Sequence, residues 1–219
     1  MYKTVGSKFK IFIIVIILIV SLIAIKKLAV DPQPVRDIKM NTVYICGSGI
    51  EYPDDDQSRY YIEFKGNKTY ILMHDDIRRK EENYDEDGDG SRPIIDIYFG
   101  KYEEKNGNCI LRPIEGAYVG FKDTNAVKKK KINSYYSAKI KNSEDETWMI
   151  IAPTSGGRYK LGYVNKKSAS IDNNRIHFML FNKSDIKKLP SSPEEFRKQF
   201  KMDKKAEQER LAKQERLAE

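Results

Sequence analysis

The sequence predicts a mainly β protein: an antiparallel meander closed as a barrel or folded as a sandwich, with one N-terminal transmembrane helix and a C-terminal polar helix. Three observations predict this class. An apolar run lies near the start, some eight or nine short runs of β-branched and aromatic residues follow with turn signals between them, and a polar segment with a helix-start signal comes last.

Residues 11–25 are apolar except for Ser21. At about 1.5 Å per residue they cover roughly 22 Å of the roughly 30 Å hydrocarbon core. Lysines flank the run on both sides, and their alkyl stems extend the span toward the headgroups. A cleaved secretory signal has a similar charged start, but no A-x-A spacing follows here. The sequence therefore predicts an uncleaved signal anchor over residues 11–30, after a cytoplasmic tail over residues 1–10.

The chain after the anchor is predicted to lie outside the cytoplasm, because long domains translocate regardless of flanking charge. The predicted location is the cell membrane, with a single pass and an extracytoplasmic C-terminal domain. Five of the 40 basic residues precede residue 31 and all 32 acidic residues follow, so 35 basic residues remain and the later part carries a formal +3. Because these charges are mixed along the chain, nucleic acid is not expected as a partner. The lysine run at residues 128–131 is interpreted as a solvated loop.

A linker is predicted at residues 31–41, because Pro32 and Pro34 favour extended backbone and no apolar periodicity is present. The β domain is then predicted over residues 42–190.

Alternation of apolar and polar residues defines the predicted strands. In residues 59–65, for example, Tyr60, Ile62 and Phe64 share one face. A Gly-Asn pair at residues 66–67 predicts a two-residue hairpin turn into a strand over residues 68–74. Asn106-Gly107 predicts a second hairpin, between residues 94–103 and 109–113. The other predicted strands are residues 42–48, 132–140, 147–152, 158–164 and 175–181.

The element order is similar to that of small lipocalin-like barrels, in which hairpins wrap an apolar interior. The resemblance lies in the layout alone. The glycine-tryptophan opening of that family is missing, and Trp148 stands in the middle of the chain. The resemblance therefore implies a fold and no particular ligand.

The most specific local pattern is an acidic twelve-residue segment that resembles an EF-hand loop. Carboxylates stand at positions 1, 3, 5 and 12, glycine at position 6, and a backbone carbonyl is available at position 7. The candidate Ca²⁺ ligands are Asp85, Asp87, Asp89, Ser91 and Asp96. The segment departs from the family because position 12 is aspartate, and Arg92 and Pro93 occupy positions 8 and 9. The alternative interpretation is an acidic, flexible connection between two strands.

Other chemistry is sparse. In an oxidising exterior, Cys46 and Cys109 could form a disulfide worth about 2–4 kcal/mol, or they could remain two buried thiols. His74 and His177 lie inside predicted strands and are interpreted as structural histidines rather than zinc ligands. No serine lies in a nucleophile elbow. The sequence therefore predicts no catalytic residue and no cofactor apart from the candidate Ca²⁺.

A capping box, Ser192-Pro193-Glu194-Glu195, predicts that a helix begins near residue 191 and continues through the tail to residue 219. Phe196 and Phe200 are one turn apart and are predicted to pack its first turns on the β domain.

These features predict a binding or interaction module of a cell envelope, held at the membrane and presenting a β domain to a small ligand or to an envelope protein. The alternative is a structural or assembly component of a membrane complex. A hydrolase is a third class. An interior cavity would favour ligand binding, an exposed apolar patch would favour assembly, and a pocket with convergent titratable groups would favour hydrolysis.

Overall fold

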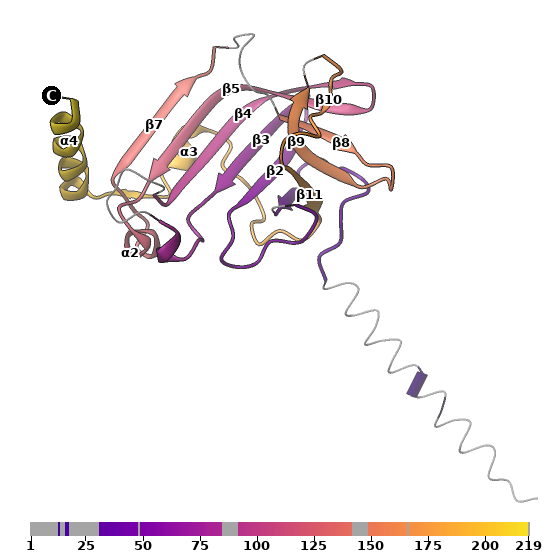
Figure 1. Ribbon diagram of the computed structural model, residues 1–219, viewed down its shortest axis with the longest axis horizontal. Helices are drawn as coiled ribbons and strands as arrows, with labels where there is room; N and C mark the ends of the chain where they lie inside the picture. The colour runs from indigo at the N-terminus through magenta and orange to yellow at the C-terminus, as the bar shows by residue number, and fades with distance from the viewer. Residues whose placement is uncertain are drawn as a thin grey trace, which may run out of the picture. The chain divides into compact units, whose positions relative to one another are not determined.

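The computed structural model describes residues 13, 16, 17, 31–47, 49–84, 92–141, 149–165 and 167–218 (Figure 1). The chain divides into two units, Met1–Gln33 and Pro34–Glu219. In the first unit, residues 13, 16 and 17 are helical and exposed, while the rest of the predicted tail and anchor lies outside the described residues. Among the described residues, no helix combines the length and the apolar character needed to cross a bilayer.

The second unit is built on a closed antiparallel barrel, which contains eight strands within the described residues (Figure 1). Each strand pairs with the one before it, and the last pairs with the first, in the ring order β1-β2-β3-β4-β5-β8-β9-β11. The strands are β1 (Val43–Cys46), β2 (Arg59–Lys65), β3 (Thr69–Asp75), β4 (Ile94–Lys105), β5 (Asn108–Gly120), β8 (Met149–Pro153), β9 (Tyr159–Asn165) and β11 (His177–Phe181). The barrel prediction is confirmed, and closure of the ring excludes the sandwich.

Smaller elements flank this ring. They are η1 (Glu81–Asn83), α2 (Thr124–Lys128), β6 (Lys131–Ile132), β7 (Ser134–Lys139), β10 (Ser170–Ile171), α3 (Pro193–Arg197), β12 (Lys201–Met202) and α4 (Lys204–Ala218). Helix α2 was not predicted from the sequence, although Asp123 caps it by accepting a hydrogen bond from Ala126 N at 2.7 Å. The lysine run at residues 128–131 ends α2 and starts β6, and it is exposed as predicted.

The barrel wall divides along β5. Cys109, Ile110 and Leu111 of β5 pair with β8, whereas residues 115–120 pair with β7, which is not part of the ring. Pro113 lies between the two stretches, and its nitrogen has no hydrogen to donate to a neighbouring strand. A register shift in the β4–β5 pairing falls at the same level. The wall is therefore interrupted between the second half of β5 and the start of β8.

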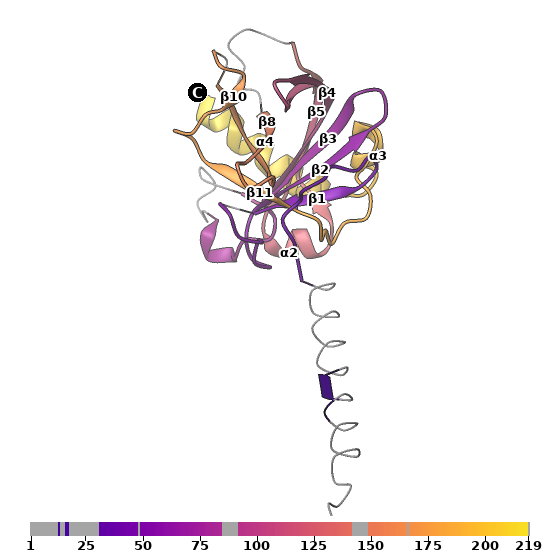
Figure 2. The ribbon, with the colours of Figure 1, turned by 90° about the vertical axis from the view of Figure 1, so that its right-hand side faces the viewer.

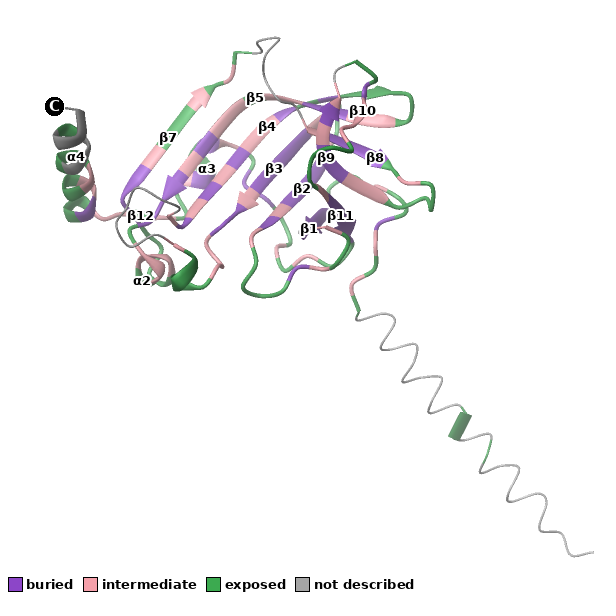
Figure 3. Cartoon of the chain, in the orientation of Figure 1, coloured by how far each residue is buried: buried purple, intermediate pink, exposed green. Residues whose placement is uncertain are grey.

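Both faces of β2 and β3 are buried, as the purple strands of Figure 3 show. The inward face carries large apolar side chains, including Tyr44, Ile62, Phe64, Leu72 and Leu180. These residues form the barrel interior.

The outward face is covered by the segment after β11, which includes α3 and lies beside the sheet in Figure 2. Leu189 and Phe196 of this segment pack with outward residues such as Val43, Ile71 and Val119. The segment also satisfies a buried carboxylate, because Leu189 N donates to Glu63 Oε2 at 3.1 Å. The layer is therefore part of the core and not a surface tail.

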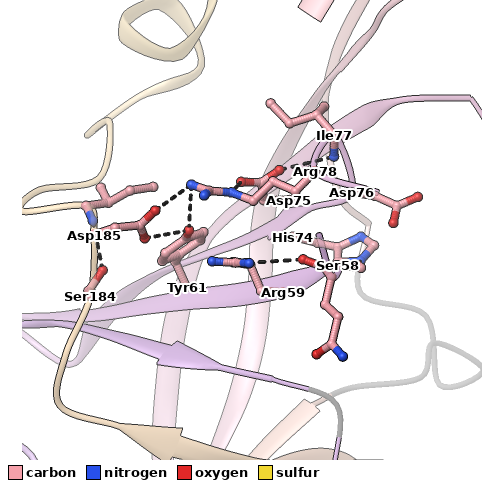
Figure 4. Close-up of polar contacts among 12 residues, drawn as sticks. Ser58, Arg59, Tyr61, His74, Asp75, Asp76, Ile77, Arg78, Ser184 and Asp185 are labelled. Atoms are coloured by element: carbon pink, nitrogen blue, oxygen red, sulfur yellow. Dashed lines mark hydrogen bonds and ion pairs between the residues drawn. The ribbon is translucent and has the colours of Figure 1, made fainter. Parts of the chain in front are cut away.

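Polar contacts fasten this segment to the end of β3 (Figure 4). Tyr61 donates its hydroxyl hydrogen to Asp185 Oδ1 at 2.7 Å, and Arg78 Nη2 lies 2.5 Å from Asp185 Oδ2. Arg78 Nε also donates to Asp75 Oδ2 at 3.0 Å. Burial by itself would raise the pKa of Asp185, but the hydrogen bond from Tyr61 and the charge of Arg78 outweigh it and lower that pKa.

The two predicted hairpin turns have different outcomes. Asn106 and Gly107 both have positive φ, at 54° and 75°, and form the two-residue turn that was predicted. The other turn contains three residues, 66–68, because Lys65 pairs with Thr69. Its positive φ angles fall on Asn67 and Lys68, so the prediction of a two-residue Gly-Asn turn is wrong.

The folded unit also begins earlier than the sequence indicated. Val35 is buried in the interior cluster, and its N–H donates to Leu180 O at 2.8 Å. Its carbonyl accepts from Tyr159 N at 3.0 Å. Part of the predicted linker therefore belongs to the barrel, where it contacts β9 and β11.

The prediction of one continuous helix over residues 191–219 is wrong. Ser192 caps α3 as predicted, but α3 stops at Arg197, and the chain then pairs β12 in parallel with β6. Asp203 starts α4 by accepting from Ala206 N at 3.2 Å. Phe196 and Phe200 pack as predicted, with ring centroids 5.4 Å apart. Strand pairing and aromatic burial outweigh the local helical preference here.

Both cysteines are free thiols. Cys46 lies on β1 and Cys109 on β5, which are four strands apart in either direction around the eight-stranded ring. Both belong to the interior cluster or pack against it. Bridged cysteines need Cα atoms about 4.4–6.8 Å apart, which opposite walls of such a barrel do not provide. The second alternative, two separate thiols, therefore describes this structure.

Candidate functional site

The candidate site is a cavity in the barrel interior, with a volume of ≈ 220 Å³. It lies where the wall divides, since Pro113 and Met149 stand on either side of the interruption. The described residues of its walls are mostly aromatic and aliphatic, with one carboxylate and one imidazole. The lining residues are Tyr60, Tyr70, Leu72, His74, Asp96, Tyr98, Leu111, Pro113, Met149 and Tyr163.

Strand register brings the polar part of this site together. Tyr60 on β2 pairs with His74 on β3, which pairs in turn with Asp96 on β4. Directly paired residues of adjacent antiparallel strands point to the same face of the sheet. Three side chains that are far apart in the sequence therefore line one wall of the cavity.

His74 connects Ser58 with Asp96. Ser58 Oγ and His74 Nε2 form a hydrogen bond of 2.8 Å. Both side chains are labelled in Figure 4. On the other side of the ring, His74 Nδ1 lies 3.6 Å from Asp96 Oδ2, which is an ion-pair distance and too long for a hydrogen bond. The ring of Tyr60 stacks on His74 with centroids 4.5 Å apart, which fixes the plane of the imidazole. The side chains of His74 and Asp96 are each 25% exposed, so solvent reaches this wall.

Four tyrosines surround the cavity. Burial raises the pKa of Tyr60, Tyr70 and Tyr98, and nearby Asp96 adds to the increase at Tyr60 and Tyr98. These phenols therefore stay protonated and uncharged, and each offers a ring face and a hydroxyl donor. Asp96 is the acidic residue among the described residues of the lining.

One glycine shapes the inner wall. A Cβ on Gly100 would lie 2.2 Å from Arg112 O and 2.7 Å from Tyr70 Cε1. Both distances are far below van der Waals contact, so only glycine lets Tyr70 and the β5 backbone approach β4 this closely. Tyr70 is thereby held against the neighbouring strand β4.

A second hollow, of ≈ 260 Å³, lies where β4, β5 and β7 meet. It is lined by Asp76, Arg92, Ile94, Tyr118, Gly120, Asn133 and Ser134. Several of these polar groups already have partners: Tyr118 donates to Ser134 Oγ at 3.1 Å, and Asp76 pairs with Arg79 at 3.2 Å. With little apolar surface, this hollow fits a small-molecule site less well than the barrel cavity does.

The predicted calcium ligands are divided by the structure. Asp85, Asp87, Asp89 and Ser91 lie outside the described residues. Asp96 is described, and it faces the barrel cavity beside His74. Among the described residues no group of three or more His, Cys, Asp or Glu side chains is placed to hold a metal. The calcium loop therefore stays a prediction, which calcium titration of the wild type and of Asp87→Ala would test.

His74 was predicted to be a structural histidine, and Ser58 was assigned no role. The predicted hairpin could have indicated part of this site, because the register of β2 and β3 places Tyr60 opposite His74. The contribution of β4 depends on its pairing with β3 and that of β9 on ring closure, and no local pattern encodes either. Comparisons of the chain with protein-family models, with curated proteins and with solved structures found no match.

Proposed function

We propose that the barrel binds a small ligand in its interior cavity, as the extracytoplasmic domain of a membrane-anchored cell-envelope protein. The observation that carries this proposal is the tyrosine-lined cavity of ≈ 220 Å³ where the wall divides. A preformed concave site with apolar walls and a few convergent polar groups is typical of ligand sites.

The size of the cavity limits the ligand. Pockets for drug-sized molecules usually measure about 300–1,000 Å³, so this one suits a single ring or a short branched chain. His74 and Asp96 supply the polar contacts, and Leu72 and Leu111 supply apolar surface. The ligand is therefore a small molecule with an apolar body and at least one polar group.

The envelope setting rests on the sequence. The apolar run over residues 11–25 and its flanking lysines support a membrane anchor, and the long β domain after it supports an extracytoplasmic location. Protease added to intact cells should digest the domain. Full protection of the domain from the protease would mean that it lies on the cytoplasmic side.

The alternative role, a component of a membrane assembly, has less support. The exposed large apolar side chains of the described domain lie on separate elements, for example Met40, Ile114, Tyr136 and Ile176. An assembly surface usually presents such residues as one contiguous patch.

One observation favours hydrolysis as a second candidate function. Ser58, His74 and Asp96 follow the order nucleophile, base and orienting acid, with Ser58 Oγ 2.8 Å from His74 Nε2. A fluorophosphonate reagent tests it by mass spectrometry. Labelling of Ser58 that His74→Gln abolishes would support hydrolysis, and an unlabelled Ser58 in the wild type would reject it.

Filling the cavity tests ligand binding. Met149→Trp adds a large ring at the cavity wall, and Ile176→Trp adds the same ring at an exposed position. Small molecules extracted from the native envelope, or found in a fragment screen by ligand-observed NMR, should bind the wild type and Ile176→Trp but not Met149→Trp. Equal binding by all three proteins would contradict the proposal.

A further inference from the structure

The charges and rings of the barrel cavity point to one class of ligand. Among the described residues that line the cavity there is no lysine and no arginine, while Asp96 contributes a carboxylate. Because Asp96 lies at the wall and is only 25% exposed, its charge is partly shielded from solvent. A carboxylate in such a partly desolvated site attracts a cation more strongly than it would in water.

The aromatic lining of the cavity also favours a cationic ligand. Tyr60, Tyr70, Tyr98 and Tyr163 come from four different strands and surround one space. The face of an aromatic ring is negative, so several rings around one space attract an organic cation. Arg175 is not among the lining residues, but its guanidinium carbon lies 3.7 Å from the centroid of the Tyr163 ring, so this ring already contacts a cation of the chain itself.

A neutral imidazole at His74 leaves the preference of the cavity for a cationic ligand unchanged. His74 Nε2 is engaged with Ser58 Oγ, and Nδ1 lies 3.6 Å from Asp96 Oδ2. That separation leaves Asp96 without a short hydrogen bond from the ring. An ammonium group in the cavity can therefore approach the carboxylate directly.

We infer that the ligand is a small organic cation, an amine or quaternary ammonium compound, whose charge sits against Asp96 and among the tyrosine rings. This inference rests on the proposed ligand-binding function and names the ligand class for the same cavity. The volume of ≈ 220 Å³ limits the ligand to a compact headgroup, such as a trimethylammonium, or to one ring with a short amine arm.

The test compares cations with their uncharged carbon isosteres. Choline is paired with 3,3-dimethylbutan-1-ol, and benzylamine with ethylbenzene, so each pair differs in charge and hardly in shape. The full chain is studied in dodecyl maltoside, because phosphocholine detergents would supply a competing headgroup. Binding is measured by NMR titration at pH 8, above the range in which imidazoles ordinarily take up a proton.

At least one cation should bind the wild type ten times or more tightly than its isostere. Asp96→Asn should reduce that ratio to about twofold or less, whereas Asp37→Asn, which removes the same charge at an exposed position before β1, should leave it unchanged. Tyr98→Leu should weaken cation binding more than isostere binding, and Tyr98→Phe, which keeps the ring, should preserve the ratio. Melting curves verify that each variant is folded.

Three results would overturn the inference. The isosteres could bind as tightly as the cations, neither member of either pair could bind, or Asp96→Asn and Tyr98→Leu could both leave the ratio intact. In each case the comparison of Met149→Trp with Ile176→Trp still decides separately whether the cavity binds any ligand. Failure of the cation class is thereby distinguished from failure of the binding function.

Discussion

Replacement of Phe196 by alanine tests whether the segment after β11 is part of the barrel core. Phe196 is 1% exposed, and its ring meets Phe200 edge to face, while Phe200 meets Phe121, directly after β5, with ring centroids 5.7 Å apart. Loss of a fully buried phenylalanine ring costs about 3–5 kcal/mol, because transfer energy and cavity formation add. A domain of about 150–250 residues loses about 2–4 °C of melting temperature per kcal/mol. The melting temperature should therefore fall by about 6–20 °C.

The assay is thermal unfolding followed by circular dichroism, on the full chain in dodecyl maltoside. Leu211→Ala is the matched control, because Leu211 lies on α4 and is 45% exposed. Its stability should stay within about 0.5 kcal/mol of the wild type. A loss below about 1 kcal/mol for Phe196→Ala, or losses of similar size for the two variants, would refute the placement of this segment in the core.

Three further perturbations have defined outcomes. Gly100→Ala should destabilise the barrel by about 1–3 kcal/mol, because its Cβ would lie 2.2 Å from a backbone carbonyl oxygen, whereas Gly66→Ala, which meets nothing within 4 Å, should change the melting temperature little. The pKa of Asp185 is lowered in the folded state, so its contribution to stability is complete above its unfolded pKa, near 4, and is lost as the pH falls through the folded value. The difference in melting temperature between wild type and Asp185→Asn should therefore be constant above about pH 5 and shrink toward pH 3; a constant difference down to pH 3 would contradict this. Removal of residues 211–219 should cost less than about 0.5 kcal/mol by urea titration, because buried Ala206, the Lys122–Glu209 ion pair and the hydrogen bond from Arg210 to Asn133 O all remain in the shortened chain. A larger cost would mean that these residues stabilise the domain.

The local patterns predicted the β elements well. Alternation located the strands to within a few residues at most ends, and Asn106-Gly107 predicted its own turn, because positive φ is a local requirement that few residue types satisfy. Capping residues were equally informative. Ser192 predicted the start of α3, and Asp123 and Asp203 carried signals for α2 and α4 that were not used.

The candidate site was less accessible to sequence reasoning. The carboxylate spacing of the acidic segment resembles an EF-hand loop, and Asp96 was therefore predicted to be a Ca²⁺ ligand. In the structure Asp96 lies beside His74 and Tyr60 through the register of three adjacent strands, and its role as a calcium ligand stays a prediction. No spacing in the sequence distinguishes these residues from other inward positions.

By itself, the sequence determined the strands, several turns and the helix caps, because each depends on residues close in the chain. Only the tertiary structure decided that the sheet closes as a ring, that β5 exchanges β8 for β7 around Pro113, and that the segment containing Phe196 covers the outer face. These features follow from long-range strand pairing and from the burial of apolar surface between elements distant in the chain. The cavity between Tyr60, Asp96 and Tyr163 is a product of that closure.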